Sequence, residues 1–231
     1  MTTLTLVRHG QASFGASNYD QLSDLGVRQS KVLGEYWSRL KPEFDAVYSG
    51  NMSRQQDTAL HALTSLGVEP NIAIEPSLNE YNFEAILRSY IPIAAAEHPE
   101  LGIQKKEFLQ NPKLFQAAFN KAIGYWLEDR AHKHEPFESW SAFSSRVSSG
   151  LRTIARPDSN NVVAFTSGGV IAVALREALG LNDEMTFRMN WRIHNGSVHR
   201  FRVGRDGLSL IGFNNIAHLE LTGDPSMITY R

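Results

Sequence analysis

Four short stretches of the sequence carry side chains that suit the chemistry of a phosphate group. They are Arg8-His9-Gly10, residues 49–54 with Arg54 at their end, Glu80, and Ser167-Gly168-Gly169. Arginine offers planar, bidentate donors to phosphate oxygens and keeps its charge at any relevant pH. A neutral imidazole nitrogen can attack phosphorus, and a carboxylic acid can protonate the leaving alcohol. Together these residue types favour phosphoryl transfer.

These side chains would meet if each followed a strand of one parallel sheet. Residues 3–7 alternate polar and apolar side chains and predict a strand that ends at Arg8. Residues 44–48, 71–75 and the apolar run 162–165 predict three further strands. Because helices are predicted between them, we expect an α/β fold: a three-layer sandwich with a mostly parallel central sheet. Ligands of such folds bind beyond the carboxyl ends of the strands, where the four stretches lie.

The expected helices follow from caps and apolar periodicity. Ser23 predicts the N-cap of a helix that runs to about Leu40. The other expected elements are helices at 53–66 and 137–155, a helix after Gly168-Gly169, and a hairpin of strands at 197–203 and 208–213. Backbone amides at the start of the helix after Gly168-Gly169 would add donors to a phosphate.

Composition narrows the possible partners. The 231 residues are 42% hydrophobic and 20% charged, which is typical of a soluble globular protein. With 23 Lys plus Arg against 24 Asp plus Glu, the net charge of -1 argues against nucleic acid or an acidic membrane surface as the main partner. The chain has no cysteine, which excludes disulfides and thiolate nucleophiles. Neither a secretory signal nor a span of roughly 20 apolar residues is visible, so we expect a cytoplasmic protein.

The first stretch, Leu6-Val7-Arg8-His9-Gly10-Gln11, resembles the signature of the histidine phosphatase superfamily, which includes the cofactor-dependent phosphoglycerate mutases. The segments that are similar to later marks of that family are 22–29, 48–59, 78–80, Asn195-Gly196-Ser197 and His218-Leu219. The resemblance implies that His9 is the nucleophile, that Arg8 and Arg54 bind phosphate, and that Glu80 is the general acid. It also implies a small phosphorylated substrate and a reaction that needs neither a metal nor a cofactor.

Ser167 departs from the family pattern. Members usually carry a second histidine at this place, in a His-Gly-Gly context, whereas this chain has Ser167-Gly168-Gly169. A serine hydroxyl can give a phosphate one hydrogen bond, but it carries no charge and reaches less far. Loss of one donor at an oxyanion contact costs about 2.7–4 kcal/mol. We therefore expect Ser167 and Gly168 to bind phosphate in a slower or differently tuned phosphatase, with His218 as a candidate for the missing imidazole.

The sequence leaves alternatives open. Glu84 is a reserve candidate for the acid, because relatives often have glycine there. The mutase relatives continue Arg-His-Gly-Glu-Ser-x-Trp-Asn, whereas this chain has Gln11-Ala12-Ser13-Phe14, which counts against a mutase. Ser167 suggests a weak or inactive phosphate-binding protein as a further alternative. A serine hydrolase is excluded, because its nucleophile elbow needs glycine where this chain has Phe165.

The middle of the chain predicts a helical insertion into a single domain. Between about 84 and 135 the pattern is helical, with no convincing strand. A stripe of large apolar residues recurs there at helical spacing, which favours core packing over a substrate-binding face. The stripe consists of Phe108, Phe115, Phe119, Ile123, Trp126 and Leu127. We expect the insertion to form a cap that overhangs the pocket.

Substrate selectivity is expected in this cap and in the loop that follows the first strand. Arg88, Tyr90 and Trp140 are candidates for residues that line the entrance. The sequence identifies neither the physiological substrate nor the oligomeric state.

Overall fold

The computed structural model describes residues 1–13, 20–101, 111–130, 137–155 and 159–230. The chain divides into two compact units. The first unit combines Met1–Glu80 with Arg146–Arg231, and the second unit is Tyr81–Ser145. The insertion expected at about 84–135 falls inside the second unit. Of the candidate site residues, Glu84 belongs to the second unit and the others to the first.

A six-stranded sheet forms the centre of the first unit, with its strands in the order β3-β2-β4-β1-β5-β6. Strands β1 to β4 run parallel to one another, whereas β5 and β6 are antiparallel at one edge. The bounds are β1 Thr2–Arg8, β2 Ala46–Ser49, β3 Ala73–Ile74, β4 Asn161–Thr166, β5 Val198–Gly204 and β6 Gly207–Asn215. The predicted mostly parallel sheet is confirmed, and each expected strand is present.

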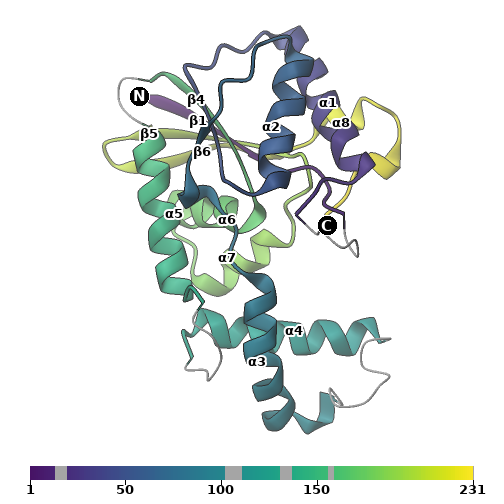
Figure 1. Ribbon diagram of the computed structural model, residues 1–231. Helices are drawn as coiled ribbons and strands as arrows, with labels where there is room; N and C mark the ends of the chain where they lie inside the picture. Colours follow the sequence, from purple (N-terminus) through teal and green to yellow (C-terminus); the bar gives the residue numbers. More distant parts are fainter. Residues whose placement is uncertain (14–19, 102–110, 131–136, 156–158, 231) are drawn as a thin grey trace. The chain divides into compact units, whose positions relative to one another are not determined.

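Helices cover both faces of this sheet and complete the predicted three-layer sandwich (Figure 1). Helices α1 and α2 lie together on one face, and α6 lies on the other. The bounds are α1 Asp24–Leu40, α2 Ser53–Leu66, α6 Gly168–Leu179, α7 Asp183–Asn190 and α8 Ala217–Glu220; α5, Trp140–Ile154, spans the boundary between the units. Helices α7 and α8 were not expected from the sequence, because they are too short to show a clear apolar period.

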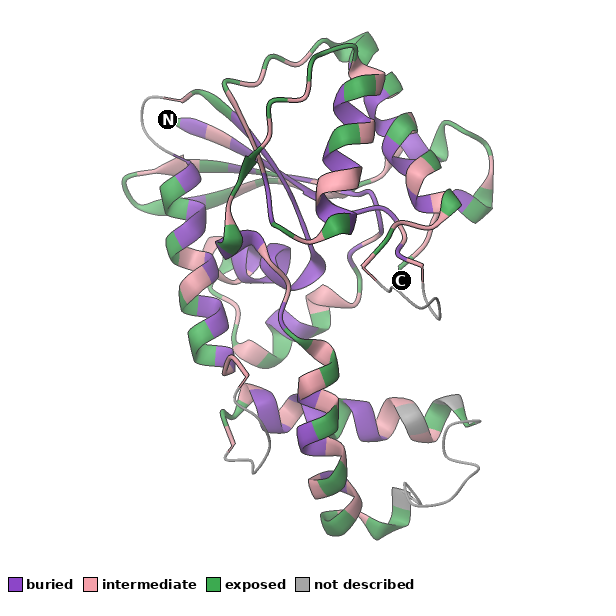
Figure 2. Cartoon of the chain, viewed as in Figure 1, coloured by how far each residue is buried: buried purple, intermediate pink, exposed green. Residues whose placement is uncertain are grey.

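The core of the first unit lies between the sheet and the pair α1 and α2. Figure 2 shows buried residues along the central strands and on the inner sides of these helices. A cluster of buried side chains that includes Val7, Trp37, Val163 and Phe165 fills this space. Burial of each such large side chain stabilises the fold by roughly 1.5–3 kcal/mol. The uninterrupted apolar run of β4 is thus explained by burial on both faces.

Helix α1 buries small residues as well as apolar ones. Gly26, Ser30 and Gly34 are buried along this helix. A Cβ atom at Gly34 would lie 2.1 Å from the carbonyl oxygen of Ala62 in α2, so no larger side chain fits there. The small residues let α1 and α2 approach closely, which a search for apolar periodicity does not reveal.

The residues that directly follow β1 are held against the start of α1. A Cβ atom at Gly10 would lie 2.4 Å from the carbonyl oxygen of Gly26, so glycine is required in the triplet that contains His9. Ser23 caps α1 as predicted, since its Oγ accepts a hydrogen bond from the Gly26 N–H at 3.1 Å. Gln29 accepts a second bond, from the Gln11 N–H, at 2.8 Å. These contacts fix the backbone on both sides of His9.

The second unit is built on helices and aromatic packing. Its helices are α3 Phe83–Glu97, α4 Pro112–Leu127 and the first residues of α5. The Trp126 ring lies 4.7 Å from that of Tyr81 and 5.2 Å from that of Trp140, measured between centroids. Phe119, Ile123 and Trp126 are buried and Leu127 is half-buried, as core packing of this stripe predicts. Phe108 and the side chain of Phe115 lie outside the described residues. Tyr90 and Trp140 are buried as well, so the expectation that they line an entrance is wrong.

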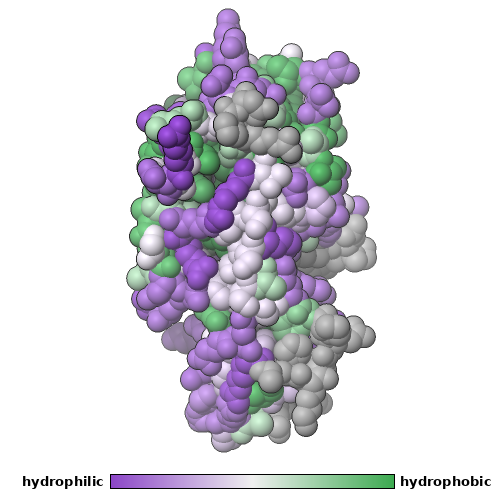
Figure 3. Space-filling model, turned by 90° about the vertical axis from the view of Figure 1, so that its left-hand side faces the viewer, coloured by the Kyte–Doolittle hydropathy of each residue, from purple (hydrophilic) through white to green (hydrophobic). Residues whose placement is uncertain are grey.

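The described surface exposes both polar and large apolar side chains. On the face that Figure 3 shows, hydrophilic and hydrophobic residues are interspersed. Within the described ranges, no helix is long and apolar enough to cross a membrane. The cytoplasmic location stays a prediction.

Candidate active site

The carboxyl ends of the central strands meet where the sequence predicts the site. Strands β1 and β4 are in register, so that Arg8 lies beside Thr166. The His9 N–H then donates to the Thr166 carbonyl at 2.9 Å. On the other side of β4, Ser49 lies beside Phe165. His9, Ser167 and the segment that leads into α2 therefore leave the sheet at one place.

His9 is held as a neutral imidazole with a defined tautomer. The side chain is 5% exposed, and its Nδ1 lies 2.7 Å from the Gly10 carbonyl oxygen. A carbonyl can only accept, so Nδ1 carries the proton and Nε2 carries the lone pair. Burial, and then the charges of Arg54 and Arg8, hold the pKa of His9 well below its ordinary value of 6.5. The Nε2 atom is thus available as a nucleophile at neutral pH.

Arg54 contacts His9 directly. It lies in the first turn of α2, is 5% exposed, and donates from Nε to His9 Nε2 at 3.2 Å. A phosphoryl group bound to Nε2 would therefore lie in contact with the Arg54 guanidinium. A cation at this place opposes the helix dipole, so the arrangement favours an anion nearby.

Asp20 supplies one such anion. Its Oδ1 accepts from Arg54 Nη1 at 2.8 Å, and its Oδ2 accepts from the Ser53 N–H, also at 2.8 Å. The N-cap residue Met52 offers no side-chain cap, and the Asp20 carboxylate takes that role. Because Nη1 and the Nε–H bond lie on opposite sides of a guanidinium, Asp20 orients Arg54 without covering the edge that faces His9.

Arg8 and Gly168 lie next to each other. The Arg8 Nη1 donates to the Ile193 carbonyl, which fixes the guanidinium at the end of β1. A Cβ atom at Gly168 would lie 2.4 Å from Asn190 Oδ1 and 3.7 Å from Arg8 Nε. Glycine is therefore needed there, and the first turn of α6 starts beside the Arg8 side chain.

Glu80 reaches the same helix end. Its Oε2 accepts from the Gly169 N–H at 3.0 Å, one residue after Gly168. Glu84, the reserve candidate, is exposed in the first turn of α3 in the second unit. The contact with Gly169 makes Glu80 the carboxylate that we carry into the proposed function.

The segment that leads to Glu80 is held from α5. Arg146 donates to the carbonyls of Pro76, Ser77 and Asn79 at 3.2, 2.8 and 3.2 Å. A Cβ atom at Gly150 would lie 1.7 Å from Ser77 Oγ, so α5 lies tightly against this turn. The Leu78 carbonyl accepts a further bond from Thr166 Oγ1 at 2.7 Å. These contacts fix the backbone from which Glu80 projects.

Ser167 occupies the N-cap position of α6 but does not cap it. Its side chain forms no capping hydrogen bond. Instead, Ser167 Oγ accepts from Nε2 of Gln55 in α2 at 2.8 Å. Ser167 is the single residue between β4 and α6, directly after the Thr166 carbonyl that accepts from the His9 N–H.

His218 lies in a different environment from the one expected for a second imidazole of the site. It is buried in α8, its ring centroid is 6.1 Å from that of Tyr36, and a Cβ atom at Gly196 would lie 3.8 Å from its Nε2. Burial lowers its pKa to about 4, so the ring is neutral. These contacts support a packing role rather than replacement of the missing histidine.

Asp20 and Gln55 are among the residues near the site that were not expected from the sequence. Asp20 comes from the polar loop after β1, where a lone carboxylate carries no signature. Gln55 follows Arg54 in α2, and an isolated glutamine in a helix is normally solvated. Burial of a polar residue beside Arg54 would have been the signal, and burial is not visible in the sequence.

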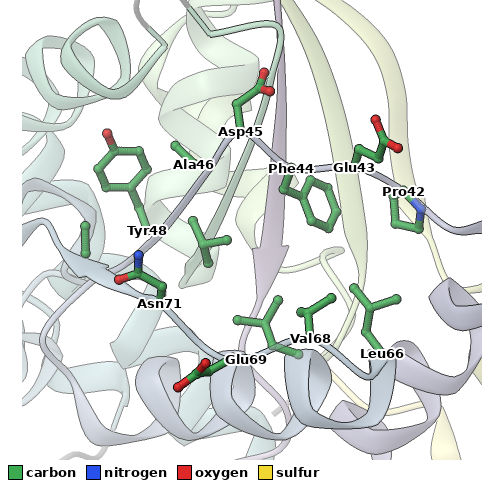
Figure 4. A pocket seen from close by; sticks show the side chains of 13 residues that line it. Pro42, Glu43, Phe44, Asp45, Ala46, Tyr48, Leu66, Val68, Glu69 and Asn71 are labelled. Carbon is green, nitrogen blue, oxygen red and sulfur yellow. The ribbon is translucent and has the colours of Figure 1, made fainter.

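The opposite end of the sheet has a cavity of about 550 Å³, which Figure 4 shows from close by. It is lined by residues before and within β2, such as Phe44 and Asp45, and by residues after α2, such as Val68 and Glu69. None of the candidate site residues lines it. The cavity lies at the amino end of β2, so we do not assign the chemistry to it.

The sequence profile of the histidine phosphatase superfamily (branch 1) matches residues 4–113 and 100–216. This match spans most of the chain, and the chain therefore belongs to the histidine phosphatase superfamily. A comparison with curated protein sequences found no match.

Solved structures share the fold over nearly the whole chain. The alpha-ribazole phosphatase of Shigella flexneri is 20% identical with a TM-score of 0.62, over 93% of this chain and 97% of its own. A phosphoglycerate mutase of Bacillus anthracis is 17% identical with a TM-score of 0.63, over 96% and 97%. A phosphoserine phosphatase of Entamoeba histolytica, in complex with 3-phosphoglyceric acid, is 18% identical with a TM-score of 0.61, over 95% and 100%. At these identities the likeness establishes the fold, which contains both phosphatases and mutases.

Proposed function

We propose that this protein hydrolyses small phosphomonoesters through a phosphohistidine intermediate on His9. The observation that carries the proposal is the contact between His9 and Arg54: a neutral imidazole presents Nε2 to a buried guanidinium at 3.2 Å. This contact supports His9 as the nucleophile and Arg54 as a residue that binds the phosphoryl group. The phosphatases among the structural relatives support the same class of reaction.

In the first step, the His9 Nε2 lone pair attacks phosphorus and forms a P–N bond. The P–O bond to the alcohol breaks, and Glu80 gives its proton to the leaving oxygen. Arg8 and Arg54 bind the phosphoryl oxygens, whose charge must be stabilised in the transition state. The Nδ1–H bond to the Gly10 carbonyl stabilises the positive charge that the ring acquires.

In the second step, water attacks phosphorus and the P–N bond breaks. The Glu80 carboxylate takes a proton from this water, which restores the acid for the next cycle. Inorganic phosphate leaves, and His9 returns to its neutral form. No atom or electron from a metal or cofactor enters this balance.

The direct test is hydrolysis of a generic aryl phosphate by the purified protein in the presence of EDTA. Turnover under these conditions supports a metal-independent phosphatase. Turnover that depends on a bisphosphate primer would favour a mutase. Binding of inorganic phosphate without any turnover would contradict the proposed enzyme activity and favour a phosphate-binding protein.

The environment of His9 predicts an unusual titration. The neutral form is the nucleophile, and burial together with two arginines lowers its pKa, so His9 stays reactive below pH 6.5 and loses its lone pair only at lower pH. In NMR spectra of the free protein, assigned by comparison with His9→Ala, the His9 ring signals should titrate with a midpoint well below 6.5. Arg54→Met should move this midpoint back up, because it removes a nearby positive charge. A midpoint at or above 6.5 in the wild type would contradict this electrostatic description.

A further inference from the structure

Gln55 connects three parts of the site through one amide group. It is fully buried in the first turn of α2, next to Arg54. Its Nε2 donates to the Leu78 carbonyl at 3.0 Å and to Ser167 Oγ at 2.8 Å. Three parts of the site therefore meet at this side chain: α2, which carries Arg54, the segment that ends in Glu80, and the end of β4.

The Leu78 carbonyl determines the direction of the hydrogen bond to Ser167. A carbonyl can only accept, so the amide atom that faces it is the nitrogen and not the oxygen. The same nitrogen faces Ser167, and Ser167 Oγ must therefore accept from it. A hydroxyl has a single proton, and within the described part of the chain Ser167 donates it to no protein group.

The backbone on both sides of Ser167 contacts residues of the proposed site. The Thr166 carbonyl, in the peptide group that Thr166 forms with Ser167, accepts from the His9 N–H at 2.9 Å. Two residues after Ser167, the Gly169 N–H contacts Glu80. Ser167 thus lies in the chain between a residue that contacts the His9 backbone and a residue that contacts Glu80, and it is buried.

We infer that Gln55 is a positioning residue that makes Ser167 a dedicated hydrogen-bond donor to the phosphoryl group. By occupying the acceptor side of the hydroxyl, the Gln55 amide directs the proton of Ser167 toward the phosphoryl oxygens beside His9. The pair Gln55 and Ser167 replaces a charged imidazole with an oriented neutral donor. This inference rests on the proposed function for its catalytic consequence, but it also predicts how the pocket binds inorganic phosphate.

The test is a double-mutant cycle with two readouts: the Kd of inorganic phosphate from calorimetry, and kcat on an aryl phosphate. The variants are Ser167→Ala, Gln55→Met and the double variant. Methionine keeps the length of glutamine and removes its donors. The matched control is Gln56→Met: Gln56 is the neighbouring glutamine of α2, and it donates to the Asn51 carbonyl at 3.0 Å on the outer side. Ser167→Thr keeps a hydroxyl and serves as the conservative variant.

Ser167→Ala and Gln55→Met should each weaken phosphate binding by about 10- to 100-fold, as expected for one hydrogen bond to a charged group. The kcat should fall at least as much, because the donor acts on the transition state. Ser167→Thr, which keeps the hydroxyl, should lose less affinity and less kcat than Ser167→Ala. The double variant should bind phosphate no more weakly than the single variant with the larger loss, and the control Gln56→Met should stay near the wild type. Such non-additivity distinguishes positioning from a merely structural role.

Losses that multiply in the double variant would overturn the inference. Wild-type affinity and kcat in Ser167→Ala would also overturn it, and this variant decides the question even if Gln55→Met does not fold. A wild type that binds no inorganic phosphate would overturn it as well. The two proposals fail separately. If turnover requires His9 but not Ser167, only the inference about Gln55 and Ser167 is wrong. If phosphate binding requires Ser167 but no turnover occurs, only the proposed hydrolase activity is wrong.

Discussion

His9→Ala should lose roughly 10⁴-fold or more of the turnover of an aryl phosphate, because a covalent mechanism cannot start without its nucleophile. Alanine removes the ring that contacts Arg54 and leaves both arginines, so binding of inorganic phosphate should survive. The measurement is kcat beside the Kd of phosphate in the same preparation. A large loss of kcat with little change of affinity assigns the chemistry to the imidazole.

The matched control for this experiment is His61→Ala. His61 is a half-buried histidine of α2 that has no part in the proposed site. Its variant should keep the turnover of the wild type. Turnover of His9→Ala above about a tenth of the wild type would contradict the proposed mechanism, because no other residue is proposed to attack phosphorus.

Glu80→Gln should have the second largest effect, and the effect should depend on the leaving group. Glutamine keeps the shape of glutamate and can still accept from the Gly169 N–H, but it cannot give up a proton. For an alkyl phosphate, whose alkoxide needs protonation, kcat should fall by roughly 10²- to 10⁴-fold. For 4-nitrophenyl phosphate, whose phenolate leaves without help, formation of the phosphohistidine should be almost unchanged. The measurement compares the rate of alcohol release in the first turnover for the two substrates.

Glu84→Gln is the matched control for the acid. It makes the same change four residues later, in the second unit, and it tests the reserve candidate directly. We expect it to behave as the wild type with both substrates. Equal losses with the two leaving groups in Glu80→Gln would show that Glu80 is not the proton donor. A leaving-group effect in Glu84→Gln would transfer that role to Glu84.

The fold could be predicted from the sequence because its signals are local. The alternation of residues 3–7, the apolar run of β4 and the Ser23 cap each depend on neighbouring residues, and each is present in the structure. The rule that ligands bind beyond the carboxyl ends of parallel strands then brought together residues that are far apart in the sequence. The register of β1 and β4, which places Arg8 beside Thr166, explains why the rule applies here.

The parts that could not be predicted depend on contacts between distant segments. Gln55 and Asp20 matter because of what lies next to them, and neither belongs to a periodic pattern. The close approach of α1 and α2 at Gly34 likewise appears only when both helices are in place. Tyr90 and Trp140 illustrate the opposite error: large aromatic residues suggested an entrance, but they are buried in the second unit.

The most direct measurement of the central claim is detection of the phosphoryl group on His9. Glu80→Gln is mixed with 4-nitrophenyl phosphate, quenched in base after one turnover, and digested for mass spectrometry. Because the activated phenolate leaves without an acid while the attacking water lacks its base, the intermediate should accumulate. The account predicts a phosphoryl group on the peptide that contains His9, at the imidazole. Release of the phenolate together with inorganic phosphate, with no phosphoryl group on His9 at any time, would contradict it.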